Sequence, residues 1–304
     1  MKLVSIVIPT YKRPEMIDRA VESALKQTYP NVEVIVVDDN DPETEERQKT
    51  EWVMRKFIDT PNVHYIRHER NKNGSAARNT GWRASHGDYV TFLDDDDEIA
   101  PTKIERQVWR LEELDSSWGA CYTAYHVLRP DGKIICSATN SEGEVYIQAL
   151  MRTFYLGSGS NLLLRRSALE AVNGYDESFL RNQDVEFMAR VAEQFKFAFV
   201  SEDLMTVHWE VRQFKRSFEF VDQVAVNYLE KFKNRIDSLS VRDQSRINIV
   251  VSLERARVAL SYGERKSCLA ILKDNHVPLR YLISYVGYLL KRKLTSTSYG
   301  FYID

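Results

Sequence analysis

An α/β fold with a mostly parallel central sheet is predicted for about the first two thirds of this 304-residue chain. Short apolar runs at 4–8, 32–37, 63–66 and 89–93 have the length and composition of buried strands. Between them, apolar residues recur at the i, i+3, i+4 spacing of amphipathic helices. Strands and helices that alternate along a chain form a parallel sheet with right-handed crossovers, so both observations predict one architecture.

The helices between these strands have separate signals. Pro14 stands near the start of the first, whose apolar face consists of Ile17, Ala20, Val21, Ala24 and Leu25. An acidic stretch that contains Trp52, Val53 and Phe57 predicts the second helix, and residues 76–84 predict a short third one.

Beyond residue 100 the alternation is less regular. The predicted elements there are a helix at 101–114, a hairpin of strands 120–128 and 134–136 around the turn 130–133, a strand at 160–164, a helix at 183–194 and a strand at 197–200. We therefore expect a first domain at 1–212 that holds all the strands.

Residues 213–304 are predicted to form a separate helical region. The net charge of −2 hides an asymmetry, because 211–304 holds 17 Lys and Arg against 9 Asp and Glu. The apolar run 281–290 is followed by Lys291, Arg292 and Lys293, and it is too short to span a bilayer but suited to lying in its surface. The alternative is that these helices pack on the first domain or on a second copy of the chain.

The composition excludes several classes of protein. With 43% hydrophobic and 28% charged residues the chain has the composition of an ordinary globular protein, and it contains no run of 18 apolar residues. The apolar run before Pro9 is too short for a signal peptide, so we expect none. Three cysteines without CxxC spacing fit a reducing compartment and no zinc site. We expect a cytoplasmic protein, peripheral on the inner face of the membrane if 281–290 binds lipid, and no nucleic-acid partner.

Polar residues follow the predicted strands where each one ends. Thr10 and Tyr11 follow the first strand, Asp38 and Asp39 follow the second, and four carboxylates at 94–97 follow the fourth. Ligands of open parallel sheets bind beyond the carboxyl ends of the strands, so these side chains outline a nucleotide pocket. The alternative is that they form ordinary polar turns.

The run Asp94, Asp95, Asp96, Asp97 is the strongest of these signals. Four adjacent carboxylates after a core strand repel one another unless a cation lies among them, and oxygen ligands suit Mg²⁺ or Mn²⁺. A solvated acidic turn is the alternative. The glycine-rich loops of Rossmann dehydrogenases and P-loop proteins are absent from the sequence, which argues against both classes.

Five motifs in order resemble those of family 2 glycosyltransferases of the bacterial surface-polysaccharide type. They lie at 4–11, 34–39, 73–81, 92–97 and 174–184, so the resemblance covers about residues 3–210. It implies a GT-A fold, a Rossmann-like and mostly parallel sheet flanked by helices, here followed by the C-terminal helical region.

The resemblance also implies roles for individual residues. Thr10, Tyr11 and Asp39 would hold the base, commonly uracil, while Arg78 would lie near the phosphates and Asp95 near the ribose or donor sugar. Asp94 and Asp96 match the ends of the DxD motif and would hold the metal, with His208 near the metal or the diphosphate. A lone histidine is also often structural.

Asp184 is the candidate general base, because inverting transfer needs a carboxylate to take the proton of the acceptor hydroxyl. An N-cap of the helix that follows is its alternative role. The family usually has Glu before this aspartate, and Gln183 stands there instead.

The resemblance predicts a metal-dependent inverting hexosyltransferase that uses Mn²⁺ or Mg²⁺. Its donor would be a nucleotide-diphosphate sugar, with UDP as the expected nucleotide, and its acceptor a saccharide or lipid-linked oligosaccharide of a surface polysaccharide or glycan. A sugar nucleotidyltransferase and a non-catalytic sugar-nucleotide-binding protein are the alternatives. Homo-oligomers are compatible with the sequence.

Overall fold

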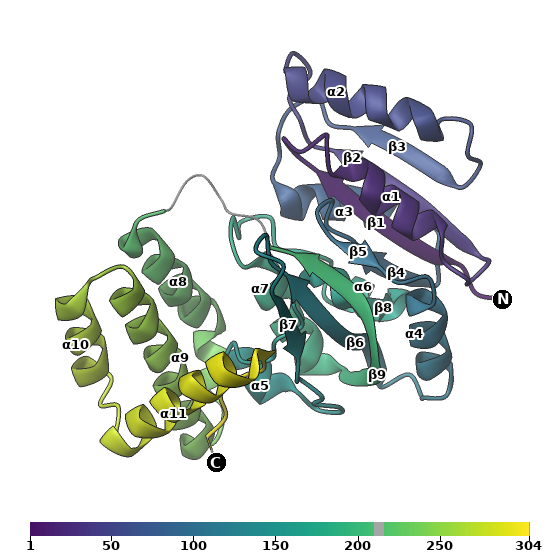
Figure 1. The fold of residues 1–304 in the computed structure, drawn as a ribbon. Helices are drawn as coiled ribbons and strands as arrows, with labels where there is room; N and C mark the ends of the chain where they lie inside the picture. Colours follow the sequence, from purple (N-terminus) through teal and green to yellow (C-terminus); the bar gives the residue numbers. More distant parts are fainter. Residues whose placement is uncertain (210–215, 304) are drawn as a thin grey trace. The chain divides into compact units, whose positions relative to one another are not determined.

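The computed structural model describes residues 1–209 and 216–303, which divide into two compact units (Figure 1). The first unit contains 1–144 and 156–209, and the second contains 145–155 with the residues described from 216 onward. The predicted domain boundary at 212 lies outside the described residues. Residues 145–155, expected in the first domain, belong to the second unit, where the Tyr228 hydroxyl donates to the Ala149 carbonyl at 2.9 Å.

The first four strands of the first unit form the predicted parallel sheet. β1 (Val4–Thr10) lies between β2 (Val32–Asp38) and β4 (Tyr89–Phe92), and β3 (Val63–Arg67) extends the sheet beyond β2. All of these pairings are parallel, so β1, β2 and β4 end at the same edge. The expected mostly parallel α/β fold is confirmed.

On the far side of β4 the sheet becomes mixed. β8 (Leu163–Arg165) pairs antiparallel with both β4 and β6 (Trp118–Leu128), and β7 (Ile134–Ser137) completes the predicted hairpin with β6. β9 (Lys196–His208) runs parallel to β6 and pairs with the short β5 (Glu98–Ile99). β9 is far longer than the predicted 197–200. The prediction stopped too early because residues 201–203, in the middle of the strand, are exposed and interrupt its apolar pattern.

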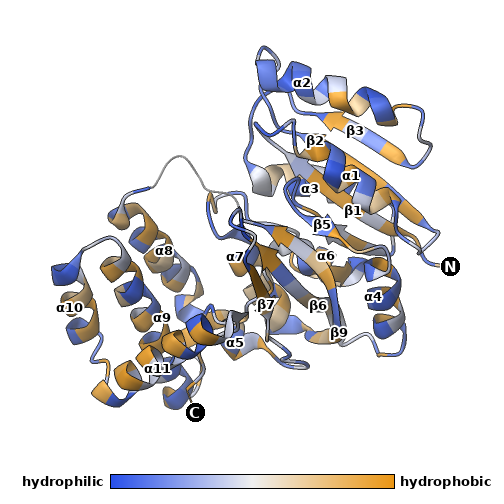
Figure 2. Cartoon of the chain, viewed as in Figure 1, coloured by the Kyte–Doolittle hydropathy of each residue, from blue (hydrophilic) through white to orange (hydrophobic). Residues whose placement is uncertain are grey.

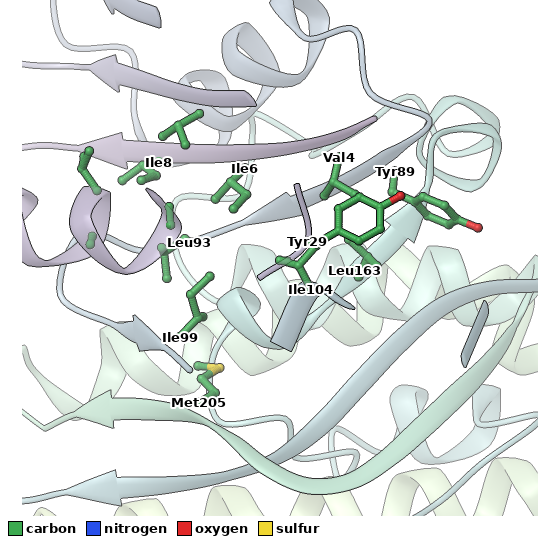
Figure 3. Close-up of a cluster of buried hydrophobic side chains, with 14 of the residues drawn as sticks. Val4, Ile6, Ile8, Tyr29, Tyr89, Leu93, Ile99, Ile104, Leu163 and Met205 are labelled. Carbon is green, nitrogen blue, oxygen red and sulfur yellow. The ribbon is translucent and has the colours of Figure 1, made fainter. Parts of the chain in front are cut away.

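Helices cover both faces of the sheet. On one face, α1 (Ile17–Leu25) and α4 (Lys103–Glu112) share a core with Val4, Ile6 and Ile8 (Figure 3). On the other face α3 (Gly74–Ala84) lies so close that a Cβ on Gly81 would stand 2.2 Å from Val7. A strand buried on both faces is apolar throughout, which explains the continuous apolar runs of the sequence.

The remaining elements complete the two units. The first unit also contains α2 (Glu45–Met54), α6 (Arg166–Ala171), α7 (Gln183–Gln194) and the 3₁₀ turns Arg55–Phe57 and Gly159–Asn161. In the second unit α5 (Tyr146–Leu150), α8 (Phe218–Asp237), α10 (Arg265–Asp274) and α11 (Leu279–Thr295) contact the central α9 (Val241–Ser261), and β10 (Thr297–Ser298) follows α11. Within the described part of the chain, no helix combines the length and apolar content needed to cross a bilayer.

Candidate active site

The acidic cluster, Asp94 to Asp97, forms a turn directly after β4. Leu93 still donates its N–H to the Val7 carbonyl at 2.9 Å, and the Asp97 N–H closes the turn on the Asp94 carbonyl at 3.0 Å. This turn brings one carboxylate oxygen each of Asp94, Asp96 and Asp97 within 4.8 Å of one another. The carboxylates therefore converge, as the cation hypothesis requires.

Two arginines partly neutralise this cluster. Arg13, in the loop after β1, forms ion pairs with Asp96 and, at 2.5 Å, with Asp95. Arg78, in the second turn of α3, forms an ion pair with Asp94. These carboxylates hold the pKa of both guanidinium groups above the usual value, although burial opposes the shift. Two cationic side chains thus lie at the acidic cluster.

Asp97 is buried behind the other carboxylates. Both the Ser158 and Ser160 hydroxyls donate to one of its oxygens, at 2.5 and 2.6 Å, and the Ser160 hydroxyl also accepts the Asp94 N–H at 2.9 Å. Burial and the charges of its neighbours raise the pKa of Asp97 to about 8. The ammonium of Lys103 donates to the Ser160 carbonyl at 3.2 Å, and burial lowers its pKa to about 7. This network fixes the backbone of the acidic turn.

Asp95 points into the core of the site and is fully buried. Burial is the largest cause that raises its pKa, to about 7, while the positive charge of Arg13 opposes the shift. Its carboxyl group therefore takes up a proton on folding between about pH 4, where the unfolded group titrates, and pH 7.

The stability of the metal-free protein is expected to fall as the pH rises through this window. Three pKa units correspond to a loss on the order of 4 kcal/mol. Urea unfolding at pH 5 and pH 7.5 tests this, and Asp95→Asn should show a clearly smaller difference than the wild type. Asp59→Asn, at an exposed position, is the control. An equal difference in wild type and Asp95→Asn would contradict the prediction.

Both carboxylate oxygens of Asp39 accept hydrogen bonds from other residues of the chain. Its first oxygen accepts from His68 Nδ1 at 2.7 Å and the Lys72 N–H at 2.8 Å. Its second accepts from Asn71 Nδ2 at 2.8 Å and the Asn73 N–H at 3.0 Å. Asp39 therefore holds the loop between β3 and α3 against the end of β2, and its contact with a base stays a prediction.

The two residues that follow β1 have different surroundings. Thr10 is buried next to Asp95, inside the acidic site. The ring of Tyr11 is 37% exposed, with the Lys12 ammonium 5.1 Å from its centre. The contacts of Thr10 and Tyr11 with a base stay predictions.

Asp184 is the second residue of α7, which has the predicted bounds 183–194, so its alternative role as the N-cap residue is wrong. Asn182 is the N-cap residue, in a left-handed conformation with φ 56° and without a side-chain capping bond. The Asp184 carboxyl group is close enough to Asp94 and Arg78 for both charges to act on it, and burial together with Asp94 raises its pKa. The structure thus brings the candidate base to the acidic cluster from about 90 residues further along the chain.

The motif at 174–177 is held against α3 by Asn79. Asn79 Nδ2 donates to the Tyr175 carbonyl at 2.9 Å and to Glu177 at 2.8 Å, while its Oδ1 accepts from the Tyr175 N–H and from Trp82 Nε1. Gly174 has φ 67°, and a Cβ there would lie 2.5 Å from the Asn79 oxygen. These contacts position the segment that leads to Asp184.

His208 ends β9 at the margin of the acidic cluster. Its Nε2 lies 3.6 Å from Glu98, and burial lowers its pKa, helped by the charge of Arg19. Arg19 in turn donates to the Asp96 carbonyl at 2.6 Å. The group of three carboxylates that could hold an ion, among the described residues, does not include His208. Its predicted role near the metal stays a prediction.

The acidic cluster suits a divalent cation. It offers only carboxylate oxygens, which are the hard ligands that Mg²⁺ and Mn²⁺ prefer. Asp94 and Asp96 remain partly exposed, at 24% and 22% of their side chains, so an ion can reach them from solvent. Asp97, in contrast, is enclosed by its two serines. Asp94 and Asp96 are therefore the residues that fit the ion best.

Arg13, Ser158, Ser160 and Lys103 belong to the site, and none of their contacts around the acidic cluster was predicted. Arg13 follows β1, so the rule that ligands gather at strand ends could have identified it. The serines lie some 60 residues from the carboxylates that they contact, and the sequence around Lys103 reads as an ordinary helix. No local sequence pattern predicts such contacts.

Comparisons with known proteins agree with this geometry. A family model described as Glycosyl transferase family 2 matches residues 5–172. The amylovoran biosynthesis glycosyltransferase AmsB of Erwinia amylovora is 28% identical over 214 residues, which are 68% of this chain and 70% of AmsB. An uncharacterized glycosyltransferase of Rickettsia bellii is 30% identical over 195 residues, 62% of this chain, and the match spans only 27% of that protein.

Solved structures share the fold. S. aureus TarS 1–349 in complex with UDP-GlcNAc has a TM-score of 0.65 at 17% identity, over 91% of this chain and 82% of TarS 1–349. The mannosyltransferase PcManGT of Pyrobaculum calidifontis, in complex with GDP-Man and Mn²⁺, has a TM-score of 0.59 at 16% identity, over 95% of this chain and 80% of PcManGT. The predicted GT-A type fold is confirmed. Because the family model covers more than half of the chain, the protein belongs to glycosyl transferase family 2 and is a glycosyltransferase.

Proposed function

We propose that this protein is an inverting, divalent-metal-dependent hexosyltransferase that uses a UDP-sugar as donor and a saccharide as acceptor. One observation carries the proposal: the convergent carboxylates of Asp94, Asp96 and Asp97 lie next to Arg13 and Arg78 at the edge where the parallel strands end. Anionic ligands for an ion and cationic partners for phosphates are the two needs of a nucleotide-diphosphate donor.

The proposed reaction assigns one task to each group. Asp184 takes the proton of the acceptor hydroxyl while its oxygen forms the bond to the anomeric carbon. The bond from that carbon to the diphosphate breaks, and its electron pair leaves with the nucleoside diphosphate. Arg13 and Arg78 turn from their carboxylates to the phosphate oxygens and stabilise the developing charge. A divalent ion held by Asp94 and Asp96 would add Lewis-acid stabilisation of the same charge.

Two comparisons support the class of substrate. TarS was solved with UDP-GlcNAc, and the protein PcManGT with GDP-Man and Mn²⁺, so proteins of this fold bind both nucleotide sugars. AmsB is named for the biosynthesis of a polysaccharide. We accordingly propose Mn²⁺ or Mg²⁺ as cofactor, and as acceptor a growing surface polysaccharide or glycan, in the form of a lipid-linked oligosaccharide. Sugar nucleotidyl transfer, the alternative reaction, receives no support from the family match.

Melting experiments with a panel of donors test this function. UDP-glucose, UDP-galactose, UDP-GlcNAc and GDP-mannose are each added with Mn²⁺, and at about 100 times its dissociation constant the true donor should stabilise the fold by about 2.7 kcal/mol. We expect one of the UDP-sugars to raise the melting temperature by about 5 °C or more. Stabilisation by GDP-mannose alone would contradict the choice of nucleotide. NMR of the transfer product should then show the anomeric configuration inverted, and retention would exclude the proposed role of Asp184.

A further inference from the structure

The outward face of α11 carries a continuous apolar stripe. Its residues follow one another at intervals of three or four positions, which places them on one side of the helix. They are Leu279, Ile283, Val286, Leu290 and Leu294, with 69%, 65%, 48%, 56% and 85% of their surface exposed. Figure 2 shows the apolar residues along this helix. Part of the predicted apolar run 281–290 thus faces outward.

The opposite side of α11 fixes this orientation. Tyr285 and Tyr288 are buried, and their hydroxyls donate to Glu254 and to the Tyr299 carbonyl, both at 2.6 Å. Arg292 also turns inward, where it donates to the Tyr288 hydroxyl at 2.8 Å. The helix cannot rotate its stripe into the second unit without breaking these buried hydrogen bonds. The stripe is therefore a surface.

Cations border the stripe on both sides. At 100° per residue, Lys293 lies along one margin and Arg280 and Lys291 along the other. All three are exposed, and α11 contains no Asp or Glu. In the described part of the chain, neither Lys291 nor Lys293 is held in an ion pair. An apolar face with cationic margins is the pattern of helices that lie in the plane of a membrane surface.

We propose that α11 lies in the surface of an anionic bilayer, with its apolar stripe among the acyl chains and its three exposed cations at the headgroups. The helix is about 25 Å long, and the spacing of the five apolar side chains places them all toward one plane along that length. A second copy of the chain would suit this face poorly, because paired α11 helices would bring like charges together along both margins without any acidic partner. The proposal does not depend on the transfer reaction.

Sedimentation of the full chain with vesicles tests the proposal. Vesicles of phosphatidylcholine with about one third phosphatidylglycerol should bind the protein, pure phosphatidylcholine should bind it at least about tenfold less, and salt should weaken binding. Replacing Ile283 and Leu290 together by Ser should lower partitioning by about 10²-fold, since each buried side chain contributes about tenfold. Replacing Lys291 and Lys293 together by Glu should lower it by at least about tenfold.

Matched changes on α10 provide the controls. Leu269→Ser removes an apolar side chain that is 68% exposed, and the Lys266→Glu, Lys273→Glu double variant reverses two exposed cations. Neither should change partitioning by more than about twofold. A wild type that binds neither kind of vesicle, or control variants that lose binding equally, would overturn the proposal. The proposal would also be overturned if light scattering showed a dimer of the wild type that the Ile283, Leu290 double variant dissociates and the control variants do not. Transfer to a water-soluble acceptor should be unchanged in every variant, which separates this proposal from the function of the active site.

Discussion

Asp184→Asn is expected to bind its UDP-sugar with Mn²⁺ as tightly as the wild type, within about twofold, and to transfer the sugar about 10²-fold or more slowly. The amide keeps the shape of the side chain but cannot accept the proton of the acceptor hydroxyl. The charges of Asp94 and Arg78 act on Asp184, which is consistent with a base that approaches a sugar whose diphosphate lies on the acidic cluster. Donor affinity by calorimetry and turnover by release of UDP measure the two effects separately.

Glu193→Gln makes the same carboxylate-to-amide change at an exposed position of the same helix. It should leave both affinity and turnover unchanged. Because burial and the charge of Asp94 raise the pKa of Asp184, its ionised carboxylate costs stability, and the melting temperature of Asp184→Asn should be unchanged or higher. Full turnover in Asp184→Asn would show that another group takes the proton. A large loss of stability with unchanged turnover per folded molecule would assign Asp184 to the fold.

The parallel half of the fold could be predicted because its signals are local. β1, β2 and β4 are buried on both faces, and such strands appear in the sequence as unbroken apolar runs. β9 is different, because the exposed residues 201–203 interrupt its apolar pattern. The membership of 145–155 in the second unit depends on contacts with residues 70 or more positions away, such as the bond from Tyr228 to Ala149. A periodic pattern contains no information on such contacts.

The same distinction applies to the site. The acidic cluster was predicted because its members are adjacent in the sequence, and adjacency after a strand guarantees their proximity. The partners of these carboxylates could not be predicted in the same way, because they are distant in the sequence. Arg13 precedes Asp96 by 83 residues, and Ser158 follows Asp97 by 61. Asp39 shows the opposite case, since its position at a strand end was predicted but its hydrogen bonds to the loop 68–73 were not.

Asp96→Ala is expected to remove the effect of Mn²⁺ on the affinity for UDP. The variant lacks one of the two partly exposed carboxylates that fit the ion, and loss of a ligand from a site with so few protein ligands should weaken metal binding by about 10²-fold or more. It also removes one negative charge and one of the two ion pairs of Arg13, which keeps its ion pair with Asp95. The affinity for UDP without metal should therefore be unchanged or higher. Asp59→Ala, at an exposed position, should behave as the wild type.

Calorimetric titration of UDP with Mn²⁺ and with EDTA, in the wild type and in Asp96→Ala, tests most directly whether the acidic cluster holds the ion that binds the diphosphate. For the wild type we predict an affinity at least about tenfold higher with Mn²⁺, because ion and diphosphate stabilise each other's binding. For Asp96→Ala we predict equal affinities under both conditions. A wild type that binds UDP equally well in EDTA, or an Asp96→Ala variant that keeps the full effect of Mn²⁺, would contradict the metal site proposed for this protein.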